Sequence, residues 1–249
     1  MNAAATLEVA GLDFAYEDAG PVLREVSFRV AAGERIGIVG PNGAGKSSLF
    51  LLIAGALRAE RGRILLDGGE LVAGRFRPEI ALVFQQAEDQ LFCPTVAEDV
   101  AFGARNLGLV GAALTARVDA ALRTVGLTHL AERPVHHLSG GEKRLTCIAG
   151  ALAMQPRLVL YDEPSAALDL RNRRRLIELL RASPQTLLIA SHDLELVLEV
   201  CERVLLLDRG RLVADGPAAA VLGDAALMTA HGQEVPASLG GGRGRLSRP

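Results

Sequence analysis

One stretch of eight residues limits what this chain of 249 residues can fold into: Gly40-Pro41-Asn42-Gly43-Ala44-Gly45-Lys46-Ser47. It matches the phosphate-binding pattern GxxxxGK followed by Ser or Thr, and it lies between an apolar run and a segment with an apolar helical face. Glycines let such a loop wrap around an anion, and the N-terminus of the following helix adds a partial positive charge. A plain glycine turn would need neither Lys46 nor Ser47. The stretch therefore predicts a nucleotide site between a buried strand and a helix.

The residues at the end of this loop have separate tasks in the predicted site. Lys46 is expected to reach the β- and γ-phosphates of ATP from a solvated loop, and the Ser47 hydroxyl is expected to bind Mg²⁺. Ser48 follows directly and belongs to the same predicted nucleotide site. ATP and Mg²⁺ are therefore the expected cofactors.

Apolar runs alternate with amphipathic segments along most of the chain. Continuous apolar runs predict strands buried on both faces, at residues 36–39, 80–84, 158–161, 187–190 and 204–207. Helical periodicity predicts helices at residues 46–57, 113–124 and 142–154. Thr95 and Glu98 have the spacing of a capping box. This alternation is typical of an α/β fold with a mainly parallel sheet.

Three regions depart from that alternation. Residues 26–30 alternate apolar and polar side chains, which predicts a half-exposed strand in an N-terminal antiparallel β subdomain. The helix-rich stretch from about residue 86 to 155 is expected to be an inserted helical subdomain. Residues 1–231 are predicted to form a single domain. Residues 232–249, rich in Gly, Arg and Ser, are predicted to be a flexible tail.

Charge and composition argue against several classes of protein. Lys and Arg number 27 against 29 Asp and Glu, so the net charge of -2 creates no basic field, and nucleic acid is not an expected partner. No apolar run approaches the roughly 20 residues of a membrane-spanning helix. The first ten residues lack the features of a signal peptide. The three cysteines form no CxxC pair and fit a reducing cytosol, so the expected location is the cytoplasm or the inner face of a membrane.

Two carboxylates end the predicted strand at residues 158–161. Asp162 suits outer-sphere coordination of Mg²⁺, and Glu163 suits polarisation of an attacking water. Two acidic residues after a strand are more often part of a solvated loop. A phosphate-binding loop upstream reverses that balance, so we expect both carboxylates at the nucleotide site.

A third motif, Leu138-Ser139-Gly140-Gly141-Glu142, opens a predicted helix. Locally it is an acceptable capping box, in which Ser139 and Glu142 satisfy free backbone N–H groups. It also resembles the LSGGQ signature of ATP-binding cassette (ABC) ATPases, with Glu142 in place of the commoner glutamine. The resemblance implies an ABC ATPase fold within the P-loop NTPase class. It also implies that Ser139, Gly140, Gly141 and Glu142 contact ATP held by a second subunit.

Other positions match the same family in order, over residues 7–216. The resemblance implies that Tyr16 stacks on adenine and that Gln85 senses both Mg²⁺ and a membrane partner. Residues 166–169 match the D-loop, and His192 matches the switch histidine near the γ-phosphate. The implied catalytic set is Glu163, His192, Lys46 and Gln85. The implied metal set is Ser47, Gln85 and Asp162.

The segment after Gln85 points to one branch of the family. Residues 84–109 resemble the ATPases of energy-coupling factor (ECF) transporters, and residues 138–154 and 227–236 look most like the cobalt and nickel branch. The resemblance implies a polytopic membrane coupling subunit and a substrate-binding membrane subunit as partners. It also implies a peripheral place on the cytoplasmic face of the membrane. The ATPase pair is expected to be a homodimer or a heterodimer with a related ATPase.

Alternative functions stay open from the sequence. The chain could serve another small-molecule importer, or it could be a non-transport ABC protein acting on ribosomes or DNA. A stand-alone P-loop switch or kinase is a further alternative, against which the signature motif argues. His136 and His137 form a histidine pair that we expect in a loop rather than at a metal, so ion selection would belong to a membrane partner.

Overall fold

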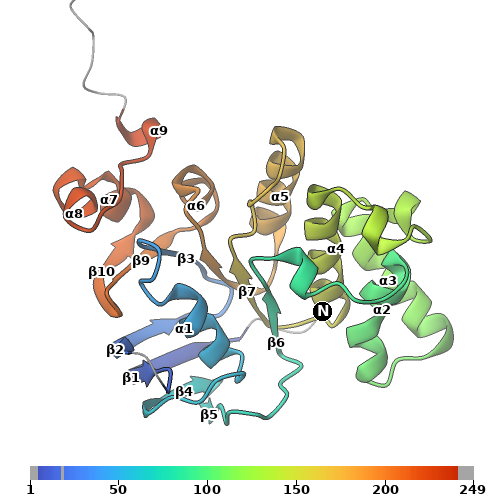
Figure 1. Ribbon diagram of the computed structural model, residues 1–249, viewed down its shortest axis with the longest axis horizontal. Helices are drawn as coiled ribbons and strands as arrows, with labels where there is room; N and C mark the ends of the chain where they lie inside the picture. The colour runs from blue at the N-terminus through green and yellow to red at the C-terminus, as the bar shows by residue number, and fades with distance from the viewer. Residues whose placement is uncertain (1–4, 18–19, 241–249) are drawn as a thin grey trace, which may run out of the picture.

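The computed structural model describes residues 5–17 and 20–240, and within them two sheets meet around one helix (Figure 1). The larger, six-stranded sheet has the order β10-β9-β3-β8-β7-β6. Its strands are parallel except for β10, which pairs antiparallel with β9. Their bounds are β3 Arg35–Val39, β6 Ile80–Val83, β7 Leu158–Asp162, β8 Thr186–Ala190, β9 Arg203–Asp208 and β10 Arg211–Pro217. The five predicted buried strands are the five parallel ones, so the prediction of a mainly parallel core is confirmed.

A second, antiparallel sheet is built from the N-terminal part of the chain. Its order is β2-β1-β4-β5, with bounds β1 Leu7–Ala15, β2 Pro21–Val30, β4 Arg61–Leu66 and β5 Gly69–Glu70. Side chains from both sheets and from helix α1 (Lys46–Ile53) form one apolar core. Phe50 of α1 lies fully buried in it. Packing α1 between two sheets fixes the loop before it, which is the predicted phosphate-binding loop.

Helices α2 (Val96–Asn106), α3 (Gly111–Val125) and α4 (Gly140–Ala153) form the inserted subdomain, on the right of Figure 1. Thr95 caps α2, and the predicted capping box with Glu98 is present. One apolar core runs from these helices to the other face of the large sheet. Helices α5 (Leu170–Ala182), α6 (Leu194–Val200), α7 (Ala218–Gly223) and α8 (Ala225–Ala230) complete the described domain.

Two predicted boundaries were wrong. Helix α1 ends at Ile53 rather than at residue 57, because Gly55 takes a left-handed conformation (φ 75°) that stops the helix. The predicted flexible tail began too early. In residues 232–240, Val235 packs on the core and the short helix α9 (Ala237–Gly240) contacts α6 through Ser238. The rest of the predicted tail, residues 241–249, lies outside the described residues.

Candidate active site

The carboxyl ends of neighbouring parallel strands bring the predicted site residues together at one edge of the large sheet. The phosphate-binding loop follows β3 and Gln85 follows β6. Asp162 ends β7, Glu163 comes directly after it, and His192 follows β8. Crevices at this edge are where open α/β sheets bind ligands. The cleft has a volume of about 370 Å³, and it is lined by Tyr16, Val22, Asn42, Gly43, Ala44, Gly45, Lys46, Ser47, Ser48, Gln85, Asp162, Glu163 and His192.

The backbone conformation of the phosphate-binding loop suits the binding of an anion. Gly43 (φ 78°) and Gly45 (φ 105°) take left-handed conformations that favour glycine. Gly45 precedes α1, which begins without a side-chain cap and without an acidic residue in its first turn. The first N–H groups of α1 therefore have no side-chain acceptor, and together with the helix dipole they suit a phosphate group.

Lys46 is buried rather than solvated, which corrects the expectation from the sequence. Only 7 % of the residue is exposed, and Nζ donates to the carbonyl oxygens of Gly40 (2.7 Å) and Pro41 (3.1 Å). Desolvation lowers the pKa of Lys46, while the charges of Glu163 and Asp162 oppose that shift. Backbone acceptors thus hold an ammonium group at the wall of the cleft.

Asp162 and Ser47 provide oxygen ligands of the kind that Mg²⁺ prefers. Burial raises the pKa of Asp162, and a hydrogen bond from Ser47 and the charge of Lys46 oppose the shift. Gln85 lines the same cleft with an exposed side chain. A hydroxyl, a carboxylate and an amide oxygen around one cleft fit a small, hard cation.

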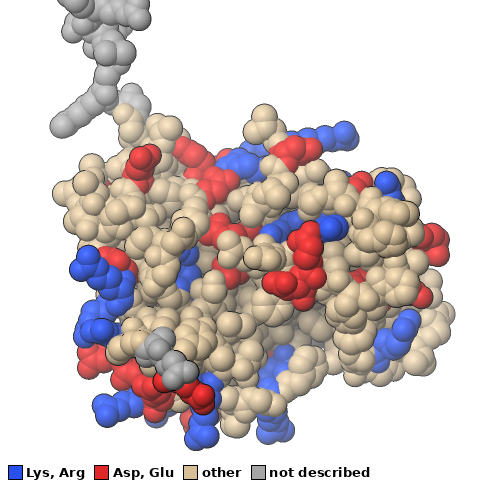
Figure 2. All heavy atoms as spheres, in the orientation of Figure 1, with Lys and Arg blue, Asp and Glu red and all other residues tan. Residues whose placement is uncertain are grey.

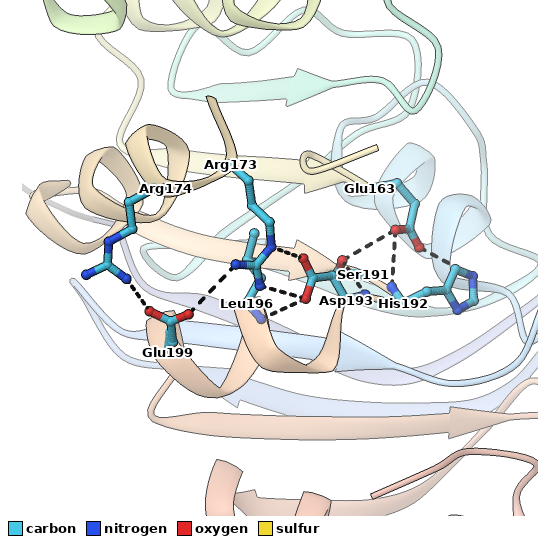
Figure 3. Close-up of polar contacts among 8 residues, drawn as sticks. All are labelled: Glu163, Arg173, Arg174, Ser191, His192, Asp193, Leu196 and Glu199. Atoms are coloured by element: carbon cyan, nitrogen blue, oxygen red, sulfur yellow. Dashed lines mark hydrogen bonds and ion pairs between the residues drawn. The ribbon is translucent and has the colours of Figure 1, made fainter. Parts of the chain in front are cut away.

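Glu163 has one carboxylate oxygen in hydrogen bonds to the loop after β8 and the other near the His192 ring, as seen in Figure 3. Its Oε2 accepts from the backbone N–H of His192 (3.1 Å) and from Ser191 Oγ (3.4 Å). Its Oε1 is buried and accepts no hydrogen bond within the described residues, although His192 Nε2 lies 3.4 Å away. A buried carboxylate oxygen with a vacant lone pair is suited to accept a proton from water.

The backbone holds this carboxylate in place. Glu163 takes a left-handed conformation (φ 49°), and its N–H donates to Ala190 O at 2.9 Å. His192 is fixed from the other side, because Nε2 donates to Asn42 Oδ1 of the phosphate-binding loop (2.8 Å). The predicted catalytic glutamate and switch histidine are therefore neighbours, joined to the loop that holds Lys46.

Tyr16 lies at the mouth of the cleft with 44 % of its surface exposed. Its ring makes an edge-to-face contact with Phe14 (centroids 4.8 Å apart), and its hydroxyl pairs with Ser48 Oγ at 3.1 Å. A flat aromatic side chain fixed beside the phosphate-binding loop suits stacking on a nucleobase. Stacking on adenine stays a prediction.

The signature residues lie elsewhere in the same chain. Ser139 caps α4, its Oγ accepts from the Glu142 N–H (3.3 Å), and Glu142 Oε2 accepts from the Ser139 N–H (2.8 Å). The backbone hydrogen bond from Ser139 lowers the pKa of Glu142. Gly141 packs closely on α5, since an added Cβ would lie 3.2 Å from Asn172 Nδ2. Ser139 and Glu142 line a second hollow, of about 880 Å³, that shares no residue with the cleft around Lys46.

Arg144 is a site residue that the sequence reasoning missed. It is buried in α4, and its two terminal nitrogens donate to the backbone oxygens of Phe84 and Gln85. Arg144 thus ties the signature helix to the segment that carries Gln85. The sequence signal for a role of Arg144 was its charge. It lies two positions after Glu142, on the face of α4 that also bears Leu145 and Ile148.

The histidine pair forms no metal cluster within residues 5–17 and 20–240. His136 and His137 lie in a short 3₁₀ turn with their rings 4.2 Å apart, and the described chain has no group of three or more metal-ligating side chains. None of the described helices is long and apolar enough to cross a bilayer.

Fold and site together define a P-loop ATPase with an inserted helical subdomain. Residues 23–166 match the family model described as ABC transporter. The chain is 44 % identical over 238 residues to the cobalt import ATP-binding protein CbiO of Rhodobacter capsulatus, covering 92 % of this chain and 85 % of that protein. It is 41 % identical over 241 residues to the energy-coupling factor transporter ATP-binding protein EcfA of Methanothermobacter thermautotrophicus, covering 92 % and 76 %.

A solved structure agrees with these relatives. CbiO1 from Clostridium perfringens, described as part of the ABC transporter complex CbiONQ, superposes with a TM-score of 0.79 at 35 % identity, covering 90 % of this chain and 93 % of that one. The chain belongs to the ABC transporter family, as an ATP-binding subunit. This membership confirms the predicted fold and the predicted enzyme class, an ABC-type ATPase.

Proposed function

We propose that this chain is the ATP-hydrolysing subunit of an ECF-type importer for cobalt or nickel ions, peripheral on the cytoplasmic face of the membrane. The observation that carries the proposal is a complete nucleotide cleft in a chain similar, along 92 % of its length, to a cobalt import ATP-binding protein. The ATPase of another small-molecule importer is the alternative. Both functions use the same cleft and differ only in the membrane partner.

The cleft suggests how the reaction proceeds. A water attacks the γ-phosphorus, its proton passes to Glu163 Oε1, and the bond to the β–γ bridging oxygen breaks to release ADP and phosphate. Lys46 carries positive charge to the β- and γ-phosphates, and His192 faces the γ-phosphate. Mg²⁺, held by Ser47 with Asp162 and Gln85, would neutralise charge on the phosphates. Ser139 to Glu142 of a second subunit close the site from outside.

A groove lined partly by residues of the segment 88–95, which follows Gln85 in the sequence, fits the expected membrane partner. It has a volume of about 520 Å³, and Phe92 lines it with 63 % of its surface exposed. Phe92 makes an edge-to-face contact with the exposed Phe102 (centroids 4.6 Å apart). Exposed aromatic pairs beside a groove are typical of a protein–protein contact. We assign this groove to the polytopic coupling subunit, which would work with a separate substrate-binding membrane subunit.

Uptake measurements test the proposal. Where genes for membrane subunits lie beside the gene for this chain, cells that express them together should accumulate radioactive cobalt or nickel, and the Glu163→Gln variant should abolish the accumulation. The same variant should lower ATP turnover by about 10²- to 10⁴-fold, the usual contribution of a general base. Uptake of a different small molecule, with no cobalt or nickel uptake, would favour the alternative importer.

A further inference from the structure

A chain of polar contacts leads from helix α5 to the site, behind Glu163 and His192 (Figure 3). At its start the guanidinium of Arg173 forms a bidentate ion pair with the carboxylate of Asp193. Nε donates to Oδ2 at 2.6 Å and Nη2 donates to Oδ1 at 2.9 Å. Asp193 is the residue directly after His192, so this pair anchors the loop that carries the switch histidine.

Asp193 connects this ion pair to the carboxylate of Glu163 through Ser191. Its own N–H donates to Ser191 Oγ (3.1 Å), and the Ser191 hydroxyl donates to Glu163 Oε2 (3.4 Å). Its carboxylate also accepts from the Leu196 N–H (3.0 Å), which caps α6. A continuous series of contacts therefore joins Arg173 to Glu163, although Arg173 does not line the nucleotide cleft.

We propose that Arg173 is a positioning residue for ATP hydrolysis, which holds Glu163 and His192 in their working geometry through Asp193 and Ser191. The proposal rests on the proposed roles of Glu163 and His192. A bidentate guanidinium–carboxylate pair fixes both distance and orientation, which a single hydrogen bond does not. Hydrolysis is more sensitive than binding to small displacements of the reacting groups.

The surroundings keep this pair ionised and half-buried. The side chains of Arg173 and Asp193 are each 25 % exposed, so solvent screens the pair less than an ordinary surface ion pair. Burial would raise the pKa of Asp193, but hydrogen bonds from Arg173 and from the Leu196 N–H bring it below its ordinary value. Asp193 is therefore a carboxylate at neutral pH and offers both oxygens to Arg173.

Glu199 of α6 gives a matched control, because it pairs with α5 and lines neither the nucleotide cleft nor the hollow around Ser139. Arg174 lies on the same helix as Arg173 and pairs with Glu199 (Nη1 to Oε2, 2.7 Å). Arg173 Nη1 also lies 3.9 Å from Glu199 Oε1. Glu199→Gln therefore weakens both ion pairs that Glu199 makes between α5 and α6 and leaves Asp193 unchanged, so it separates loss of helix packing from loss of positioning.

The test compares turnover with nucleotide affinity in the full chain. For Arg173→Met we expect kcat for ATP to fall about ten- to hundredfold, while KM and equilibrium ATP affinity stay within about twofold. Glu199→Gln should keep kcat within about twofold, with a fall in Tm similar to that of Arg173→Met. Arg173→Lys should recover part of the loss in kcat, since it keeps the charge but not the planar fork.

A second substitution tests whether Arg173 acts on the site through Asp193. Asp193→Asn keeps an oxygen for the α6 cap but cannot accept both donors of Arg173, so its kcat should also fall. The double variant Arg173→Met/Asp193→Asn should be no slower than the slower single variant, because both act through one contact. Asp193→Asn also carries the test if Arg173→Met does not fold.

Several results would overturn the proposal. Parent kcat in Arg173→Met, equal losses of kcat in Arg173→Met and Glu199→Gln, or strictly additive losses in the double variant would each do so. Glu163→Gln distinguishes this failure from that of the proposed function. If Glu163→Gln is inactive while Arg173→Met is fully active, only the positioning role fails. If Glu163→Gln turns over ATP at the parent rate, the role proposed for Glu163 fails as well.

Discussion

The burial of Lys46 sets what its removal does. Lys46→Ala removes a charged donor for two phosphates, and a hydrogen bond to a charged group contributes about 1.5–3 kcal/mol. ATP affinity should therefore fall at least about a hundredfold. The fold should survive, because removal of a desolvated charge offsets the loss of its hydrogen bonds to the carbonyl oxygens of Gly40 and Pro41. Titration with a fluorescent ATP analogue measures the affinity, and circular dichroism checks the fold.

Lys143→Ala is the matched control for that measurement. Lys143 pairs with Glu88 at 2.9 Å and does not line the cleft, so its loss should leave the ATP affinity of the single chain unchanged. Equal affinities in the parent and in Lys46→Ala would contradict the phosphate-binding role of Lys46.

The hydroxyl group of Tyr161 contributes nothing to the stability of the fold. The residue is fully buried in β7, its hydroxyl has no hydrogen-bond partner within the described residues, and burial raises its pKa. An unsatisfied buried hydroxyl costs about 1–3 kcal/mol. Tyr161→Phe should therefore raise the free energy of unfolding by about 1 kcal/mol, measured by urea denaturation. Tyr16→Phe serves as the comparison and should show no gain, because the Tyr16 hydroxyl has Ser48 as a partner.

At this scale the sequence predicted which residues meet at the cleft but not what holds them. Lys46, Asp162, Glu163 and His192 could be placed because each follows a strand that was itself predictable. The restraints by Arg144, by Arg173 and by Asn42 could not, since each joins positions far apart in the chain. Asn42 and His192, for example, are 150 residues apart. No local pattern encodes a contact of that kind.

At the scale of elements, the loop before α2 presents an aromatic side chain on a stable backbone. Asp99 of α2 accepts from the N–H groups of Phe92 and Cys93, both at 2.9 Å, so the loop does not depend on the Phe92 ring. Asp89→Ala/Phe92→Ala should therefore reduce ion uptake at least about tenfold, while ATP turnover of the isolated subunit stays within about twofold. A central aromatic side chain in an interface contributes about 2 kcal/mol or more, which supports that magnitude.

Gln90 is best left unchanged in that experiment. Its side-chain oxygen accepts from the Phe84 N–H (3.2 Å), so its removal would disturb the backbone next to Gln85 and confuse coupling with catalysis. Val72→Ala is the control, since Val72 is an exposed apolar residue that does not line the groove. Parallel losses of uptake and of turnover in Asp89→Ala/Phe92→Ala would count against a role of this loop in coupling.

Element boundaries show where sequence patterns stop being informative. Apolar residues continue past Ile53, so periodicity alone extended α1 to residue 57, whereas the left-handed Gly55 ends the helix. Composition predicted a flexible tail from residue 232. Two hydrogen bonds between Ser238 and Glu195 hold α9 on α6 instead (3.0 and 2.6 Å). Glycine-rich composition reports the cost of ordering a segment, not the tertiary contacts that offset it.

At the scale of the whole molecule, the two regions that we propose to form one nucleotide site lie apart within a single chain. The cleft around Lys46 and the hollow around Ser139 share no residue, and each lies at the start of a helix. Figure 2 shows basic and acidic side chains interspersed on one face, and the net charge is only -2. Long-range charge attraction therefore contributes little to bringing two copies together. An anion bound between two helix N-termini can hold the two copies together instead.

Mixing two defective variants tests this completion between subunits. Lys46→Ala and Ser139→Arg should each spoil both sites of a homodimer, because every site would use Lys46 from one copy and Ser139 from the other. A mixed dimer should contain one doubly damaged site and one intact site. The intact site pairs Lys46 of the Ser139→Arg copy with Ser139 of the Lys46→Ala copy. We expect ATP-dependent dimerisation to return on mixing, with one ATP bound per mixed dimer, as measured by light scattering and nucleotide quantification.

Dimerisation is the better readout, since hydrolysis can require both sites. Mixing Lys46→Ala with the double variant Lys46→Ala/Ser139→Arg is the control and should recover nothing, because no copy then supplies Lys46. Failure of the first mixture to dimerise, with both variants folded, would exclude a site shared between two copies of this chain.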